Sequence, residues 1–243
     1  MISFLKMRAF LHLSILFSLM NFLGACSPQP IAEKAVHVSG AMKHVMKRGE
    51  LGATIHLDTL SPKTGLYGVG PLAYLRGEIM LYDGDCYISR VTEDSMMKVV
   101  SSYDASAPFF VYSRVLEWDS FPLPNTIQNI PQLERYIDSL SKSSPRPFAF
   151  RMEGRVEQAQ IHVQNLPKGS TVSSPEEAHR GQVKYKVEQE EVFITGFFST
   201  QHQGIFTHHD SYLHMHLLTA DKQKMGHLDQ AEWGRMQLYL PKQ

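Results

Sequence analysis

Three histidines lie close together near the C-terminal end of the sequence. The segment YLHMHLLTADKQKMGHL, residues 212–228, contains His214, His216 and His227. Residues two apart in a strand point to the same face, so His214 and His216 share one. A turn centred between residues 221 and 222 would place His227 directly opposite His216 across a hairpin. The spacing therefore predicts three imidazoles that converge on one point, which is typical of a zinc site with an open coordination position.

The alternative is three solvated histidines on an exposed strand face, because the chain has 12 histidines and clusters arise by chance. His208 and His209 lie just before the pair. Three interpretations are open for these two residues: extra ligands, part of a substrate-contacting loop, or plain surface residues. We expect them to lie in a loop near the metal. Asp229 shares the strand face of His227 and could orient an imidazole by hydrogen bonding.

The elements that must position these residues are mostly strands. Alternating residues around an Asp-Gly pair predict a β-hairpin over residues 73–91, and a second hairpin over 147–164 turns at Glu153-Gly154. Helical spacing predicts two helices, at residues 39–51 with Ser39 as its cap and at 129–144 with Pro131 near its start. Residues 58–72, rich in Gly and Pro, predict a loop. Further strands are predicted at residues 107–118, 182–200, 211–221 and 226–241.

Composition and charge limit the classes of function that the sequence suggests. The length of 243 residues suits one large or two small domains, and 43% hydrophobic residues are typical of a globular protein. Lys+Arg 24 and Asp+Glu 24 give a formal net charge of zero. Nothing in this balance predicts a nucleic acid partner.

The N-terminal stretch MISFLKMRAFLHLSILFSLMNFLGAC has a charged head, an apolar middle and small residues before Cys26, the layout of a secretory signal peptide. LGAC resembles the bacterial lipoprotein signal, in which the cysteine becomes the lipidated first residue. We therefore expect an exported protein anchored to a membrane through Cys26, at the periplasmic face or cell envelope. The alternative is an ordinary signal peptide. If Cys26 is lipidated, Cys86 has no partner in the chain and is expected to be a buried strand residue.

A longer stretch, GFFSTQHQGIFTHHDSYLHMHLLTADKQKMGHLD, is similar to the C-terminal signature of α-acetolactate decarboxylase. The segments GLYGVGPLAYLRGEIMLYDGDCYISR, APFFVYSRV and PFAFRMEGRVEQAQIHV follow in the family's order, and the likeness covers about residues 39–240. With the strand pattern, this resemblance implies an α+β, mostly β fold of two packed β-rich subdomains. We expect a mixed sheet, an antiparallel sheet, a few helices and a metal site on a β-hairpin.

The resemblance also implies an activity, the conversion of 2-acetolactate to acetoin and CO2. It assigns Zn2+ to His214, His216 and His227, and catalytic roles to Glu78 and Arg151. Zinc would act as a Lewis acid on the hydroxyl and ketone oxygens. Arg151 could hold the carboxylate through its two-pronged donor fork, and Glu78 could deliver the proton that completes acetoin. The alternatives are a surface salt bridge for Arg151 and a solvated strand residue for Glu78.

Two features depart from the family's pattern. Tyr74 stands where a second glutamate is usual, and a further glutamate of a longer C-terminal tail has no clear match, since only Asp229 and Glu232 follow His227. The alternative function is therefore an exported lipoprotein of the same fold that binds metal or a small hydroxy-keto acid with altered or no catalysis. The sequence leaves a homodimer open.

The predicted organisation has four parts. Residues 1–25 are a lipoprotein signal peptide and 26–38 a tether. Residues 39–164 form an N-terminal β-rich subdomain, and 165–243 form a C-terminal metal-binding β subdomain, with the boundary at NLPKGSTVSSPEEAHRG.

Overall fold

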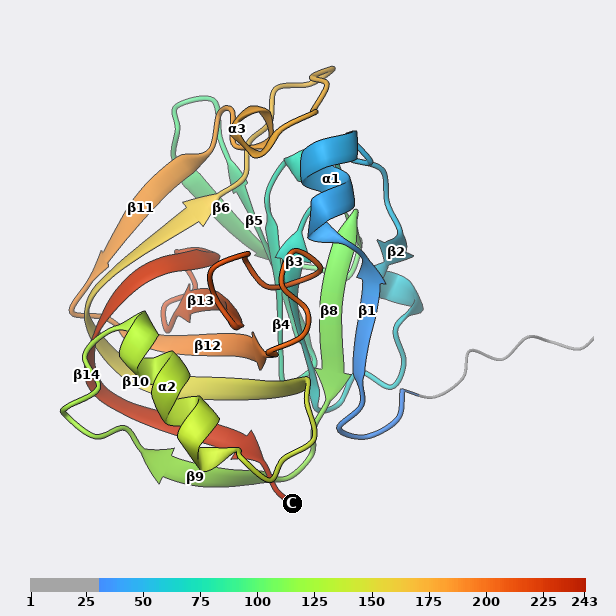
Figure 1. Cartoon of the computed structure of the whole chain (residues 1–243). Coiled ribbons are helices and arrows are strands. Elements are labelled where there is room, and N and C mark those ends of the chain that lie inside the picture. Colours follow the sequence, from blue (N-terminus) through green and yellow to red (C-terminus); the bar gives the residue numbers. More distant parts are fainter. Residues whose placement is uncertain (1–30) are drawn as a thin grey trace, which may run out of the picture.

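The computed structural model describes residues 31–243, which form two six-stranded sheets with three α-helices. The strand order is β1-β8-β3-β4-β5-β6 in the first sheet and β11-β10-β12-β13-β14-β9 in the second. β10 also pairs with β14, which closes β10, β12, β13 and β14 into a ring. The strands of the first sheet run across those of the second, and α2 packs against the second sheet (Figure 1). This mostly β architecture confirms the predicted fold class.

The first sheet contains the predicted Asp-Gly hairpin. Its turn residues, Asp83 and Gly84, have φ values of 48° and 88°, the left-handed conformation that a tight two-residue hairpin turn requires. All of its pairings are antiparallel, whereas we predicted a mixed sheet. Its strands are β1 (Val36–Gly40), β3 (Leu66–Pro71), β4 (Glu78–Tyr82), β5 (Asp85–Val91), β6 (Met97–Ser101) and β8 (Phe109–Arg114). A small separate pair joins β2 (Ile55–His56) to β7 (Ser106–Ala107).

The predicted loop at residues 58–72 is wrong at its second half, because β3 is a fully buried strand. Its two glycines lie against the ring of Phe110 on β8, so they serve close packing between strands and do not mark a turn. Cys86 is buried on β5, as expected.

The second sheet corrects another prediction. β10 (Phe148–Val163) is one long strand and does not turn at Glu153-Gly154. Gly154 has a φ of +137°, and a Cβ there would lie 2.2 Å from the Arg235 carbonyl oxygen on β14, so glycine permits a close strand crossing. The predicted strand at residues 182–200 is a hairpin of two strands, and β9 was not predicted. The remaining strands are β9 (Trp118–Pro122), β11 (Val183–Glu188), β12 (Glu191–Phe198), β13 (Leu213–Thr219) and β14 (Met225–Pro241).

The two predicted helices are present as α1 (Met42–Arg48) and α2 (Ile130–Leu140). The N-cap of α1 is Ala41, and the expected cap, Ser39, lies in β1. The Asn129 side chain caps α2 by accepting a hydrogen bond from the Gln132 backbone, and Pro131 occupies the first turn. The other helical segments are α3 (Pro175–Ala178), η1 (Leu57–Thr59) and η2 (Ala73–Leu75).

The sheets divide the chain near residue 116, since the first sheet ends at Arg114 and β9 begins the second at Trp118. The predicted boundary at residue 165 falls between β10 and β11, which pair with each other. It therefore does not separate the two sheets. Residues 36–38 of the predicted tether belong to β1. The predicted signal peptide and Cys26 lie outside the described residues. Among residues 31–243, no helix is long and apolar enough to span a membrane.

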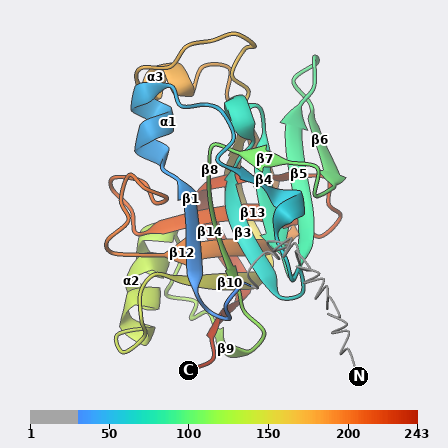
Figure 2. The same ribbon diagram turned by 90° about the vertical axis from the view of Figure 1, so that its right-hand side faces the viewer.

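The two sheets are packed face to face through apolar side chains, and Figure 2 shows β12 and β14 crossing behind β3 and β4. The Thr195 hydroxyl on β12 donates to the Leu81 carbonyl on β4 at 2.8 Å, a direct link between the sheets. The side chains that join them are Tyr67, Val69, Met80, Tyr87, Val111, Ala149, Phe197, Leu218 and Met225. The histidine-bearing strands β13 and β14 thus present one face to the first sheet, where water is excluded.

Candidate metal centre

The three predicted histidines meet between the two sheets. His216 on β13 pairs directly with His227 on β14, which confirms the predicted register. His214 lies two residues earlier on the same face of β13. One nitrogen of each imidazole can be chosen so that all three lie within 4.8 Å of one another. Gly226, next to His227, lets the β10 backbone lie close to β14, because a Cβ there would lie 2.4 Å from the His162 carbonyl oxygen on β10.

The three imidazoles are buried, and those of His214 and His216 lack hydrogen bonds that buried polar groups require. His214 and His216 are 2% and 0% exposed, so the alternative of solvated surface histidines is wrong. His214 Nδ1 and both ring nitrogens of His216 have no hydrogen-bond partner. Leaving a buried polar atom unpaired costs about 1–3 kcal/mol. A bound cation would satisfy one nitrogen of each ring, so the residues present fit a zinc ion.

The electrostatic surroundings keep these imidazoles neutral. Burial, with added repulsion from nearby His208, lowers the pKa of His214 to about 3. Burial also holds the pKa values of His216 and His227 well below 6.5, with added repulsion from His214 on His216 and from His162 on His227. The Phe206 and Ile79 carbonyls oppose these shifts weakly, without forming hydrogen bonds to His214 Nδ1 or to His216. Neutral imidazole is the form that binds metal.

Glu78 reaches the histidines from the first sheet. It begins β4, is buried, and places Oε2 3.7 Å from His216 Nε2. Its Oε1 accepts a hydrogen bond from the Gln164 backbone at 3.1 Å. Burial raises the pKa of Glu78 well above 4.5, and Asp229 adds to this rise, while the Gln164 hydrogen bond opposes it. Burial thus favours the uncharged form of both His216 and Glu78, and their 3.7 Å separation is longer than a hydrogen bond.

His162 on β10 is a neighbour that sequence reasoning missed. It pairs with His227 on the side opposite His216, and the His162 and His227 ring centroids are 4.7 Å apart. Its Nδ1 lies 2.7 Å from Asp229 Oδ1. A register shift between residues 160 and 161 of the β10–β14 ladder re-aims this part of the strands. Asp229 therefore orients an imidazole, as predicted, but the imidazole is that of His162. The sequence did not reveal this contact, because we predicted a turn at Glu153-Gly154 where β10 in fact continues straight.

Arg151 lies in a different cluster. Its Nη1 donates to the Tyr82 hydroxyl at 2.8 Å and to the Glu153 carboxylate, and its guanidinium lies 4.0 Å from the centre of the Tyr239 ring. It makes no hydrogen bond or ion pair with Glu78 or with the histidines of the described chain. The fold thus brings Glu78 to the candidate centre and directs Arg151 elsewhere.

The loop before β13 brings one more histidine to the group. His208 is partly buried, with Nε2 3.2 Å from His227 Nε2. The next residue, His209, has a side chain that is 91% exposed. Of the two loop histidines, His208 lies near the candidate centre as predicted, whereas His209 does not.

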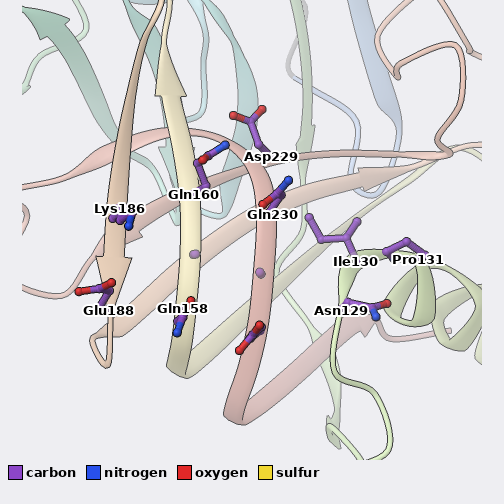
Figure 3. A pocket seen from close by; sticks show the side chains of 12 residues that line it. Asn129, Ile130, Pro131, Gln158, Gln160, Lys186, Glu188, Asp229 and Gln230 are labelled. Atoms are coloured by element: carbon purple, nitrogen blue, oxygen red, sulfur yellow. The ribbon is translucent and has the colours of Figure 1, made fainter.

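A hollow of about 350 Å3 reaches the group at His227 and is also lined by His208, Asp229 and the start of α2. A second hollow, of about 470 Å3, lies between β10, β11, β14 and the start of α2, and Asp229 stands at its upper end (Figure 3). Tyr74 lines neither, and its side chain is 60% exposed.

Comparisons with known proteins identify a family from the sequence and a shared fold from the structure. The family model described as Alpha-acetolactate decarboxylase matches residues 37–242. The structure of alpha-acetolactate decarboxylase from Bacillus subtilis strain 168 is similar with a TM-score of 0.70 and 20% identity, covering 86% of each chain. The structure of a Staphylococcus aureus protein of unknown function, similar to alpha-acetolactate decarboxylase, has a TM-score of 0.71 and 18% sequence identity, covering 84% of each chain. No curated protein sequence matches. At these identities the structural likeness supports the fold alone.

Proposed function

Since the family model matches residues 37–242, the chain belongs to the alpha-acetolactate decarboxylase family, and we propose that it converts 2-acetolactate to acetoin and CO2 with a bound zinc ion. The observation that carries this proposal is the set of three buried histidines with ligand nitrogens within 4.8 Å of one another. His214, His216 and His227 would hold the ion. A bound zinc would supply a Lewis acid for the hydroxyl and ketone oxygens of the substrate.

The reaction needs a proton at the carbon that loses CO2. The bond between that carbon and the carboxylate breaks, its electron pair stays on the remaining fragment, and a proton replaces CO2. Glu78 is the buried carboxyl group next to His216, and burial raises its pKa well above 4.5. A cation beside it would oppose this rise, because a nearby positive charge favours the carboxylate form. We assign Glu78 the role of proton donor.

The substrate also carries a carboxylate that must be oriented. Arg151, the residue implied by family resemblance, already donates to Tyr82 and Glu153. His162 lies beside His227 and is held by Asp229 at 2.7 Å. Since a carboxylate only accepts hydrogen bonds, Asp229 fixes the proton of His162 on Nδ1 and leaves Nε2 free to accept one. His162 lies beside a proposed zinc ligand, whereas Arg151 lies in a different cluster, so we assign His162, ahead of Arg151, to substrate positioning.

We further propose export and a lipid anchor at Cys26. This proposal rests on the charged head, apolar middle and LGAC sequence of the N-terminal segment. It places the reaction at the cell envelope.

A second candidate function is binding of metal or of a small hydroxy-keto acid without turnover. Two observations favour it. His208 lies against His227 in the hollow that leads to the centre, where it would obstruct a substrate. Tyr74, at the position of a family glutamate, is 60% exposed and lines hollows that contain none of the candidate ligands.

A colorimetric acetoin assay separates the two. Purified full-length protein in mild detergent is supplied with zinc and 2-acetolactate. Steady acetoin formation by the wild type, and its loss in His216→Ala, is the expected result. Zinc binding without acetoin formation would contradict the decarboxylase proposal and favour the binding protein.

A further inference from the structure

His208 approaches the candidate centre through a single close contact. Its Nε2 lies 3.2 Å from His227 Nε2, and the two ring centroids are 5.0 Å apart. The ring is partly buried, and its Nε2 faces a nitrogen of a proposed ligand. Each imidazole has one ring nitrogen that can offer a lone pair to a cation.

The separation of these nitrogens suits a shared ion. Two nitrogens that each lie about 2.0–2.1 Å from the same tetrahedral zinc are about 3.3 Å apart. We propose that His208 is a fourth nitrogen ligand, so that the ion of the proposed metal centre is held by His208, His214, His216 and His227. This inference rests on the metal site of the proposed function. His208 contacts His227 and is not among the three histidines whose ligand atoms lie within 4.8 Å of one another, so ligation needs an inward movement of residues 208–210.

The loop that carries His208 is anchored on both sides. Before it, Phe206 and Thr207 are fully buried, and the Gly204 backbone donates to the Thr207 carbonyl at 2.8 Å. After it, the Glu134 carboxylate on α2 accepts hydrogen bonds from the Ser211 hydroxyl and the Tyr212 backbone, both at 2.8 Å. Only residues 208–210 span the gap between these anchors. The loop thus holds the His208 ring against His227 and turns His209 into solvent.

A fourth protein ligand changes what the site does at rest. Three histidines leave a position for water or substrate, whereas four nitrogens complete the tetrahedral set that zinc prefers. A substrate that binds through two oxygens must then displace His208 first. Since His208 also lines the hollow leading to the centre, its displacement would clear the path that the substrate uses.

The test compares two neighbouring histidines of the full-length protein. In His208→Ala, the zinc dissociation constant should rise at least tenfold, the lower end of the effect seen when even outer-shell partners of a metal site are removed. In the matched control His209→Ala, whose side chain is 91% exposed, it should not change. The cobalt-substituted proteins add a readout of ligand type, since the visible absorption of cobalt changes when one nitrogen ligand is replaced by water.

Each outcome decides the proposal. A changed cobalt spectrum together with weaker zinc binding in His208→Ala alone supports ligation. Weaker binding with an unchanged spectrum assigns His208 to hydrogen bonding with His227 and overturns it, as does unchanged binding. If His208→Ala does not fold, X-ray absorption of the zinc-loaded wild type counts imidazole ligands, and four support the proposal whereas three overturn it. None of these results depends on acetoin formation. Absence of zinc binding by the wild type would instead reject the metal site itself.

Discussion

His216 and His227 are direct cross-strand partners in the β13–β14 ladder, and both are buried against the first sheet. A shift of this register by one residue would turn one imidazole away from the other, because side chains alternate between faces along a strand. The pairing therefore fixes the candidate metal centre. In this arrangement Glu78 from β4 lies beside His216, and His162 from β10 lies beside His227.

The first prediction concerns zinc content. His214→Ala and His216→Ala should each lower the bound zinc from about one ion per chain to a small fraction, because two remaining imidazoles make a poor zinc site. Metal analysis of the purified, dialysed proteins measures this directly. His56→Ala, at an exposed histidine far along the sequence, should keep its zinc. Full zinc content in the His214→Ala, His216→Ala double variant would rule out these residues as ligands.

The second prediction concerns the stability of zinc-free protein as a function of pH. The pKa values of His214, His216 and His227 are lowered by folding, so the unfolded chain binds more protons below about pH 6.5. Their contribution to stability is complete above that pH and is lost as the pH falls toward the folded pKa, which is about 3 for His214. Each of the three histidines lowers the free energy of unfolding by about 1.4 kcal/mol for every unit that the pH falls within this range.

Glu78 acts in the opposite sense, because its pKa is raised on folding, but one carboxyl does not offset three histidines. Urea unfolding of chelator-treated protein at about pH 7.5 and about pH 5.5 should therefore show a lower midpoint at the lower pH. His216→Gln should make this drop smaller. An equal or higher midpoint at about pH 5.5 would show that the imidazoles are not buried in neutral form.

The third prediction assigns a role to Glu78. Glu78→Gln keeps the size of the side chain but cannot transfer a proton, so kcat should fall about a hundredfold or more while zinc content stays the same. Acetoin formation and metal analysis on the same preparation measure both. Glu157→Gln, at an exposed position of β10, is the matched control and should leave both unchanged. A kcat within a few-fold of the wild type would exclude Glu78 as the proton donor.

The fourth prediction separates the two readings of Arg151. Its guanidinium joins β10 to Tyr82 on β4 and stacks near Tyr239, so Arg151→Lys should lower the free energy of unfolding by about 1–2 kcal/mol. Zinc content should not change. Chemical denaturation measures the effect, and Tyr82→Phe should reproduce part of it. Normal stability with a large loss of acetoin formation would instead support the substrate-binding role implied by family resemblance.

The fifth prediction concerns the N-terminus. Cys26→Ser should move the protein from the membrane fraction to the soluble fraction, because acyl chains on this cysteine would provide the anchor. Cell fractionation followed by immunoblotting measures the distribution, and Cys86→Ser serves as a control that should stay in the membrane fraction. Unchanged membrane association of Cys26→Ser would point to a retained N-terminal segment.

Local patterns in the sequence predicted the candidate ligands. The spacing of His214 and His216 gives one strand face, and the polar turn between the strands sets the partner of His216. Both follow from the two-residue period of a strand and from a short connection, so no distant contact is needed. The Asp83-Gly84 hairpin was predictable for the same reason, since its turn chemistry is local. Several segments, including the His-x-His segment, resemble one family and follow in the same order along the sequence. This resemblance indicated the fold.

Tertiary structure alone decided what surrounds these ligands. Glu78 reaches His216 from another sheet, and His162 faces His227 only because β10 continues straight through Gly154 and closes a ring with β14. Gly154 looks like a turn residue in the sequence, but the close approach of Arg235 explains it. The burial that lowers the histidine pKa values likewise arises only when the two sheets pack together. These contacts join segments far apart in the chain, and their energies depend on neighbours that no local pattern of residues specifies.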